Sequence, residues 1–354
     1  MRKLIMYASL AALTFTACEN DPQEENLENQ IDMSDFRLTI EETPSAEQGR
    51  QCHSMEVLNR QISENPELIQ RMYEIEEFTR IQAQIQSRPP GNGNGNGNGN
   101  SGGGDPDPDP TGDNLGAITI PVVVHVIYNN ANQNISDQQI TSQINVLNAD
   151  FNKSNSDLNQ VPSEFSSLIA DVDVNFTLDQ VIRVSSTRTS WGTNDAMKFS
   201  SNGGSDAVSP NTKLNIWVCN IGGGILGYAQ FPGGNSATDG VVVGPQFFGT
   251  TGFVSAPFDK GRTATHEVGH WLNLRHIWGD GRCNRDDFVN DTPKSDAPNY
   301  GCPNYPVNNC RSNDMSMNYM DYVDDACMQM FSEGQKTRMR TIFLAGGPRD
   351  SFIP

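Results

Sequence analysis

The feature that most constrains the fold of this chain is a run of eleven residues, His266 to His276, that holds three of its five histidines. His266 and His270 are four residues apart, which on an α-helix places them about 40° apart around the axis and one turn apart along it. Both imidazoles can therefore reach one ion. His276 lies six residues beyond His270, which is not a helical spacing. The chain must turn sharply between them, and Asn273 is a residue type that tolerates the left-handed conformation such a turn needs.

These histidines predict a metal site. Three neutral nitrogens with one open position are typical of catalytic zinc, because structural zinc sites usually close with a fourth Cys or His. We therefore expect one Zn²⁺ held by His266, His270 and His276. Glu267 lies beside them, where its carboxylate can accept a proton from a water on the metal. The alternative, three ordinary histidines on a half-buried helix, leaves their clustering unexplained.

Composition shows where a globular domain can lie. Residues 19–90 hold 16 acidic and 6 basic residues, and residues 91–112 are rich in Gly, Asn, Asp and Pro. Neither stretch can bury a large core, so we predict an acidic segment, a tether and a main domain at 113–354 of about 240 residues. The net charge of the chain is −19, which argues against nucleic-acid binding and against binding to anionic membrane surfaces.

Residues 1–18 are predicted to be an export signal. Met1-Arg2-Lys3 precedes an apolar run that is too short to span a bilayer. The sequence Phe15-Thr16-Ala17-Cys18 resembles a bacterial lipobox, in which Cys18 is acylated, and simple secretion is the alternative. We thus expect either a lipoprotein of the bacterial outer membrane and cell surface or a secreted protein. A lipid on Cys18 would be the only membrane contact.

Hydrophobic patterns predict an α/β (α+β) main domain. Predicted strands lie at 118–128, 172–178, 214–219, 222–231 and 240–243. Predicted helices lie at 64–86, at 136–151 with Ser136 as N-cap, after Thr263, and near 334–344.

The stretch between the last two predicted helices is irregular and contains four cysteines. Disulfides persist in exported proteins, and four cysteines allow three pairings, among which the residues alone do not choose. Cys219, in an apolar stretch, is expected to be a buried free thiol. The four cysteines are Cys283, Cys302, Cys310 and Cys327.

The same region holds a cluster of oxygen donors. Such a loop suits Ca²⁺, which takes six to eight oxygen ligands, and a solvated acidic turn is the alternative. The donors are Asp286, Asp287, Asn290, Asp291 and Thr292, of which the last four are the candidate ligands.

Three motifs together carry a family resemblance. His266 to His276, then Asn290-Asp291-Thr292-Pro293, then Asn318-Tyr319-Met320-Asp321-Tyr322 resemble, in order, the motifs of the pappalysin family of metzincin zinc metallopeptidases. The resemblance covers about residues 115–345, with Asn273 where most metzincins have Gly. It implies a zincin fold, in which a twisted mixed sheet and an active-site helix lie above an irregular, disulfide-clamped C-terminal subdomain.

The resemblance also implies roles for single residues. Met320 is the Met-turn residue, a hydrophobic base beneath the zinc, where ordinary core packing is the alternative. Tyr322 is the phenol that stabilises the tetrahedral intermediate, where a surface-loop aromatic is the alternative. The stretch 224–229 resembles the edge strand that pairs with extended substrates. Structural calcium is implied near the oxygen-donor cluster. The implied disulfides are Cys283–Cys310 and Cys302–Cys327.

Cys52 stands alone in the acidic segment, with Arg50 close by. A thiolate from a pro-segment can occupy the open position of the zinc and keep the enzyme latent, as in pappalysin zymogens. An unpaired cysteine of no consequence is the alternative. Activation would require a cut before the main domain, for which Arg80–Ile81 is one candidate. Family members that prefer a basic side chain after the scissile bond use an acidic residue just before the last Cys, where this chain has Ala326, next to Asp324 and Asp325.

The sequence thus predicts a zinc-dependent endopeptidase made as a latent precursor, with protein or peptide substrates and a monomeric state. Glu267 is the predicted general base. Two other classes stay open. One is a non-catalytic zinc-binding surface lipoprotein with a role in adhesion or substrate binding. The other is a protein that uses zinc only structurally, which would need a fourth protein ligand.

Overall fold

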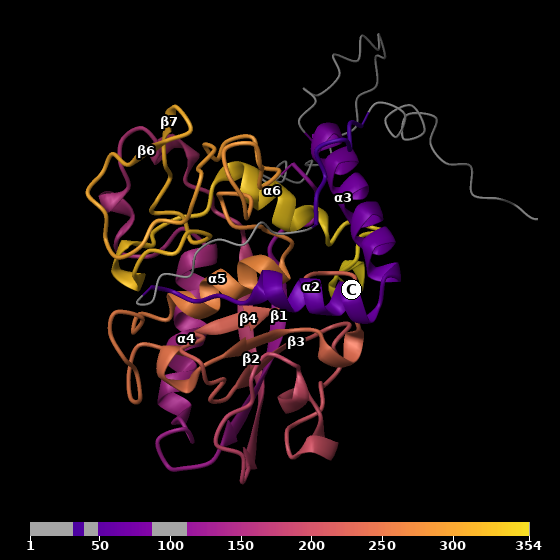
Figure 1. Ribbon diagram of the computed structural model, residues 1–354, viewed down its shortest axis with the longest axis vertical. Coiled ribbons are helices and arrows are strands. Elements are labelled where there is room, and N and C mark those ends of the chain that lie inside the picture. Colours follow the sequence, from indigo (N-terminus) through magenta and orange to yellow (C-terminus); the bar gives the residue numbers. More distant parts are fainter. Residues whose placement is uncertain (1–30, 39–48, 87–111, 354) are drawn as a thin grey trace, which may run out of the picture.

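The computed structural model describes residues 31–38, 49–86 and 112–353. The predicted export signal, including Cys18, and the predicted tether up to residue 111 lie outside the described residues. In the described part of the chain, no helix combines the length and apolar character that a bilayer span requires. We call the described residues before 87 the N-terminal segment. This segment lies across the main domain, whose sheet and loop-rich half are both visible in Figure 1.

Five strands form one mixed, mostly parallel sheet, which confirms the predicted sheet. Its order is β2-β1-β3-β5-β4. β4 pairs antiparallel with β5 at one edge of the sheet, and the other pairs are parallel. The strands are β1 (Ile118–Tyr128), β2 (Val174–Ser185), β3 (Leu214–Val218), β4 (Gly227–Ala229) and β5 (Val241–Val243).

Side chains of the central strands pack on both faces of the sheet, because they alternate along each strand. Ile216 of β3 belongs to the main core with helices α4 (Asp137–Phe151) and α5 (Arg262–Trp271), whereas Trp217 belongs to a cluster on the other face. The predicted cap of α4 is confirmed, since the Ser136 hydroxyl accepts a hydrogen bond from the Gln139 backbone N–H at 3.1 Å. The helix predicted after Thr263 is α5, which begins at Arg262.

β2 extends to Ser185, beyond the predicted end at Leu178. It continues to pair with β1 as far as Tyr128, although most of its later side chains are partly or fully exposed. A pattern of apolar residues cannot detect a strand whose side chains are not buried, which explains the short prediction.

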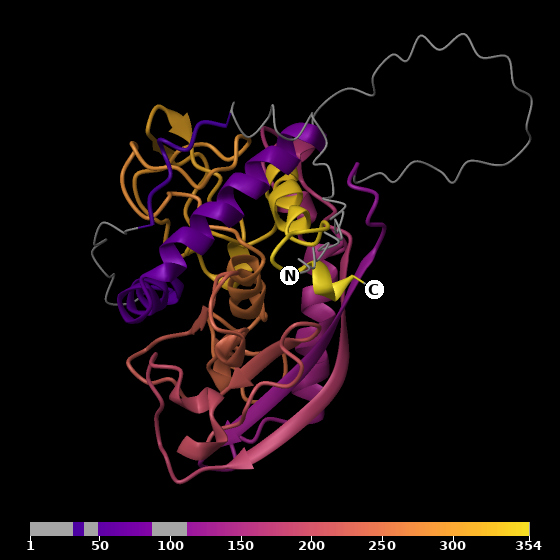
Figure 2. The ribbon, with the colours of Figure 1, turned by 90° about the vertical axis from the view of Figure 1, so that its right-hand side faces the viewer.

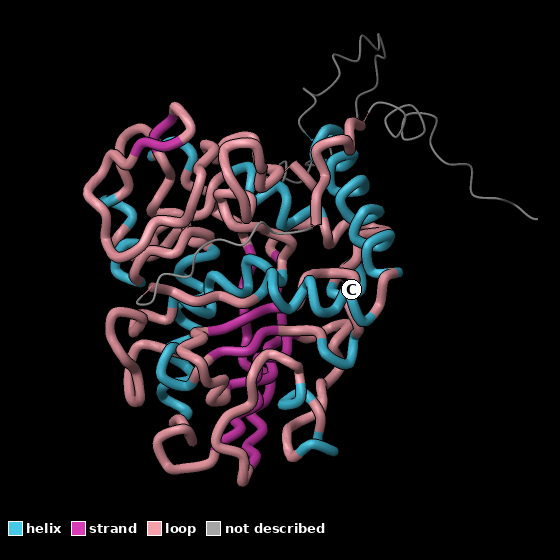
Figure 3. Tube along the Cα trace, in the orientation of Figure 1, coloured by secondary structure: helices cyan, strands magenta, loops and turns pink. Residues whose placement is uncertain are grey.

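The stretch between α5 and α6 (Glu333–Thr341), which is described without gaps, is almost entirely loop (Figure 3). It contains the two-residue strands β6 (Asn308–Asn309) and β7 (Ser312–Asn313). Disulfides join Cys283 to Cys310 and Cys302 to Cys327, which confirms the implied pairing.

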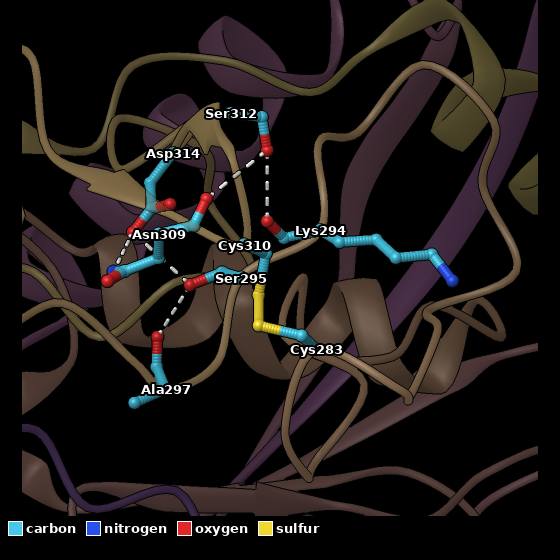
Figure 4. Close-up of a disulfide and its surroundings, with 8 residues drawn as sticks. All are labelled: Cys283, Lys294, Ser295, Ala297, Asn309, Cys310, Ser312 and Asp314. Atoms are coloured by element: carbon cyan, nitrogen blue, oxygen red, sulfur yellow. Dashed lines mark hydrogen bonds between the residues drawn. A yellow bond between two sulfur atoms is a disulfide. The ribbon is translucent and has the colours of Figure 1, made fainter.

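Polar contacts surround the first of these disulfides (Figure 4). The Asp314 carboxylate accepts hydrogen bonds from Ser295 at 3.2 Å and from Asn309 at 2.7 Å. The Ser312 hydroxyl donates to the Lys294 carbonyl at 3.3 Å. Covalent links and polar contacts therefore stabilise a region with little apolar content, as the predicted disulfide-clamped subdomain requires.

The N-terminal segment contains α2 (Ser54–Glu64) and α3 (Glu67–Gln86). The sequence predicted one helix over 64–86, and α2 was missed. Pro66 separates the two helices, because proline lacks an N–H and disfavours a helical conformation in the preceding residue. α2 contacts β4, and α3 contacts α6 (Figures 1 and 2).

The candidate cleavage site Arg80–Ile81 lies inside α3, where Arg80 pairs with Glu76 at 2.8 Å. A protease must bind its substrate in an extended form. The helix therefore disfavours this bond as the activation site.

Candidate metal centre and active site

A contact at Nδ1 orients each of the three predicted metal ligands. The Nδ1 atoms of His266 and His270 hydrogen bond with the carbonyls of Tyr319 at 2.7 Å and Leu274 at 2.8 Å. Asn273 has φ of 73°, the left-handed conformation predicted for the turn. His276 Nδ1 contacts Asp280 Oδ1 at 2.5 Å. In each contact an oxygen accepts from Nδ1, so Nε2 is the nitrogen that faces the metal position.

The three Nε2 atoms converge with the thiol of Cys52. Among the described residues, the ligand atoms of Cys52, His266, His270 and His276 all lie within 4.8 Å of one another. The Nε2 atoms of His270 and His276 are 3.1 Å apart, and His266 Nε2 is buried without a hydrogen-bond partner. Burial and the neighbouring imidazoles hold the pKa of His266 and His270 well below the usual value, so both rings are neutral. Three such nitrogens and one sulfur fit a tetrahedral zinc site.

Glu267 is buried beside these ligands. Its Oε2 accepts a hydrogen bond from the Ser54 hydroxyl at 2.8 Å and lies 3.2 Å from Cys52 Sγ. Burial raises the pKa of Glu267 to about 7. Gly227 of β4 lies directly above, and a Cβ atom there would be 2.9 Å from the Val242 carbonyl and 3.0 Å from Glu267 Cγ. Glycine therefore lets the edge strand approach the carboxylate closely.

The N-terminal segment runs along β4 in the parallel direction. The Leu226 N–H donates to the Gln51 carbonyl at 3.0 Å, and the His53 N–H donates to the Gly227 carbonyl at 3.2 Å. The Ala229 N–H donates to the Ser54 hydroxyl at 2.8 Å. The segment thus occupies the strand edge at the metal centre.

Arg50 is anchored on one side of the metal centre. Its guanidinium contacts Asp325 Oδ1 at 2.5 Å and donates to the Thr263 hydroxyl at 3.1 Å. The side chains of Arg50 and Asp325 are both almost fully buried. Of the two aspartates considered from the sequence, Asp325 therefore binds Arg50. Asp324 is partly exposed and is affected by Arg50 only through charge.

Met320 and Tyr322 both lie next to the three histidines. Met320 is fully buried beneath α5, and a Cβ on Gly269 would be 2.4 Å from its sulfur. The Tyr322 ring centroid is 4.9 Å from that of His276, and its hydroxyl donates to the Cys52 carbonyl at 3.1 Å. The phenol can therefore reach a carbonyl placed next to the metal position.

The candidate calcium ligands form two groups of contacts. Asp287 is buried, and the Thr292 hydroxyl, which has one proton to donate, lies 2.9 and 2.8 Å from its two carboxylate oxygens. Asp291 accepts from the Ser332 hydroxyl at 2.6 Å and from the Gly334 N–H at 2.8 Å, so it binds the start of α6. Asn290 is exposed. A calcium ion at these residues stays a prediction.

Three residues of the site were not singled out from the sequence. Ser54 bonds to the carboxylate of Glu267, Asp280 orients His276, and the Trp278 ring stacks on His276 with centroids 4.3 Å apart. Their closeness in sequence to Cys52 and His276 was an available signal. Hydrogen-bonding groups next to a metal ligand orient it, and an aromatic ring stacked on it shields it from solvent.

Comparison with known proteins agrees with this geometry. The family model described as "Pregnancy-associated plasma protein-A" (peptidase M43) matches residues 209–344. Extracellular metalloprotease 1 of Coccidioides posadasii is 33% identical over 236 residues, which cover 64% of this chain and 77% of the relative. This chain belongs to the pappalysin family. It is a metalloendopeptidase, and the predicted family membership is confirmed.

Solved structures of this family extend the comparison. Mature mirolysin of Tannerella forsythia, in complex with a cleaved peptide, is 46% identical with a TM-score of 0.66, covering 67% of this chain and 96% of that one. A promirolysin variant from the same organism is 39% identical with a TM-score of 0.72, covering 86% of this chain and 97% of that one. Because residues 112–354 make up about two thirds of this chain, the promirolysin match reaches into the N-terminal segment.

Proposed function

We propose that this protein is the latent precursor of an exported zinc endopeptidase. His266, His270 and His276 would hold the ion, and Cys52 would be a fourth ligand until the N-terminal segment leaves. The convergence of these four ligand atoms within 4.8 Å carries the proposal. When bound, zinc supplies Lewis-acid activation of water and of the scissile carbonyl.

Glu267 is the proposed general base. Within the described parts of the chain, its Oε2 has polar contacts only with Ser54 and Cys52, both in the N-terminal segment. When the segment leaves, this oxygen is free to take the proton of the attacking water and to deliver it to the leaving amine. A carboxylate beside the metal position is placed to accept this proton and then to donate it.

Tyr322 is proposed to stabilise the oxyanion. Its hydroxyl donates to the Cys52 carbonyl, which stands in for a substrate carbonyl. A phenol placed there can strengthen its hydrogen bond as negative charge develops on the oxygen. Met320 contributes as packing beneath α5.

The direction of the N-terminal segment supports latency. Arg50 lies at Asp325, Cys52 at the metal position, and α2 beyond it. We propose that Asp325 binds a basic side chain after the scissile bond, as the family resemblance implies. A substrate would then run opposite to the N-terminal segment and antiparallel to β4. The N-terminal segment fills the cleft with its backbone reversed, so its own bonds are not presented for attack.

The domain boundaries and cellular location belong to the same proposal. We propose a pro-segment at 19–90, a tether at 91–112 and a catalytic domain from 113, where Asp113 forms a buried ion pair with Arg340 at 2.6 Å. Extracellular metalloproteases among the relatives support export.

Acylation of Cys18 would anchor the protein at the cell surface, which incorporation of labelled palmitate would test. Structural calcium near Asp287 is part of the proposal.

The test is cleavage of casein by the activated protein. A recognition sequence for a specific protease, inserted between residues 91 and 100, lets the full chain be cut and the N-terminal segment be removed. We expect cleavage that is lost with a zinc chelator and in Glu267→Ala. A folded, zinc-loaded protein that cleaves nothing would instead favour the non-catalytic binding lipoprotein, which the metallopeptidase relatives do not support.

A further inference from the structure

A second buried carboxylate contacts the N-terminal segment on the other side of the metal centre. Along β4 the segment contacts Leu226, Gly227 and Ala229 in turn, and Gln61 of α2 then donates to Gln230 at 3.0 Å. Next to Gln61, the guanidinium of Arg60 pairs with Asp195. On each side of the metal position, therefore, an arginine of the N-terminal segment pairs with a buried aspartate of the main domain.

The two oxygens of Asp195 have different partners. Oδ1 is held by the main domain, with Lys198 Nζ at 2.9 Å and the Tyr228 hydroxyl at 3.1 Å. Oδ2 is contacted by Arg60 and Gln61, both from the N-terminal segment. Lys198 is fully buried and also donates to the Thr238 carbonyl at 2.7 Å, so it stays in place when the segment leaves. Oδ2 then loses its partners while the carboxylate stays ionised by Lys198.

The space beside Asp195 can admit a side chain. A cavity of about 350 Å³ lies there even with α2 in place. On the main domain it is lined by Asn194, Asp195, Phe199, Gly234, Asn235 and Thr238. On the other side of α2, Met55 and Leu58 pack with Phe231, whose ring centroid is 5.3 Å from that of His270. Removal of α2 would therefore uncover Phe231 beside the metal centre as well as Asp195.

We propose that Asp195 forms a second substrate subsite, which binds an arginine or lysine side chain several residues before the scissile bond. The proposal rests on the proposed function, since Asp325 must define the side after the scissile bond. Arg60 is the model for the occupant, because a guanidinium gives Oδ2 a charge-assisted hydrogen bond.

The position of the basic residue follows from the geometry. Six residues of helix separate Ser54 from Arg60, a rise of about 9 Å. An extended substrate covers that distance in about three residues at roughly 3.3 Å each. Ser54 is already close to the metal centre, so the basic residue should be the third to fifth before the scissile bond.

The experiment uses the activated wild-type enzyme and peptides with arginine after the scissile bond. Each of the third, fourth and fifth preceding positions carries in turn arginine or citrulline, its neutral isostere. At one of these positions, we expect kcat/KM to be about five- to tenfold higher for arginine, because a partly exposed charged hydrogen bond adds about 1 kcal/mol. The ratio should fall as salt is raised.

Variants show whether Asp195 causes the preference. Asp195→Asn should bring the arginine-to-citrulline ratio to about one, and Asp179→Asn, on β2 at the opposite sheet edge, should keep it. Since Asp195→Asn leaves Lys198 buried without its partner, the double variant Asp195→Asn/Lys198→Met provides a neutral replacement of the pair. Equal cleavage of arginine and citrulline peptides by the wild type would overturn the proposal, as would a preference that survives in a folded Asp195 variant. Failure to cleave any peptide or casein would refute the proposed function instead.

Discussion

The N-terminal segment contacts the main domain at two places of different character. At the active-site contact, residues 50–54 reach the metal ligands, Glu267 and Asp325 through a few buried polar groups. At the helical contact, α3 packs on α6, and its Thr79 hydroxyl accepts a hydrogen bond from the Asn273 amide in the turn after α5 at 3.4 Å. There Glu76 forms a buried ion pair with Arg338 at 2.5 Å, and Arg338 Nε donates to the Asn273 carbonyl at 2.8 Å.

The difference suggests a division of labour. In the proposed latent form the active-site contact blocks the chemistry, but five residues provide little area for binding. We infer that the helical contact, which lies away from the reacting groups, provides the affinity that keeps those five residues in place. The turn between the second and third histidines also contacts residues 31–38 of the N-terminal segment, because the Arg275 guanidinium donates to the Arg37 carbonyl at 2.9 Å.

The largest effect is expected for Glu267→Gln. The Glu267 carboxylate contacts the N-terminal segment in the latent form and is the proposed general base of the activated enzyme. Loss of the general base should lower kcat of the activated enzyme by about 10³-fold. The variant should still bind zinc, as a metal assay would show. Activity within tenfold of the wild type would mean that another group takes the proton.

The helical contact is tested by Glu76→Gln. This change leaves Arg338 buried without its charge partner, so the latent chain should lose about 3 kcal/mol of unfolding free energy, measured by urea denaturation. Glu74→Gln is the matched control, because Glu74 is exposed on the same helix and should cost under about 0.5 kcal/mol. Equal effects of the two variants would refute the role given to the ion pair.

The same ion pair sets a pH dependence. The arginines beside Glu76 outweigh the effect of burial and lower its pKa to about 2. A lowered carboxylate pKa gives stability that is complete above the ordinary value near 4.5 and is lost as pH falls through 2. The difference in stability between wild type and Glu76→Gln should thus be constant from pH 7 to 5 and shrink by about 3 kcal/mol towards pH 1. A difference that does not change with pH would contradict this assignment.

A smaller effect is expected for Cys52→Ala in the full chain. The thiol is lost but the helical contact remains, so casein cleavage should rise only about tenfold above the latent level, or about 1.4 kcal/mol. Glu76→Gln weakens the helical contact and should also raise casein cleavage by the full chain, and in the double variant the two increases should multiply, because distant sites act independently. An unchanged latent level in Cys52→Ala would remove Cys52 from the account.

The sequence predicted those parts of the site that depend on local spacing. His266, Glu267 and His270 follow from helical periodicity, and the left-handed Asn273 follows from the position of His276. The pairing of the four cysteines came from the family resemblance and not from their spacing. α2 was missed because its apolar pattern is short and because Pro66, just after it, is typical of a loop.

Contacts between distant residues could not be predicted in the same way. Arg338 and Glu76 are 262 residues apart, and Asp195 is 135 residues from Arg60. Nothing in either local pattern indicates its partner, because such pairs form only when the folded surfaces meet.

The most direct test of latency is X-ray absorption at the zinc edge of the zinc-loaded full chain. The account predicts three nitrogen ligands and one sulfur at about 2.3 Å, with the sulfur lost in Cys52→Ala and after removal of the N-terminal segment. A first shell of the intact chain that contains no sulfur would contradict it.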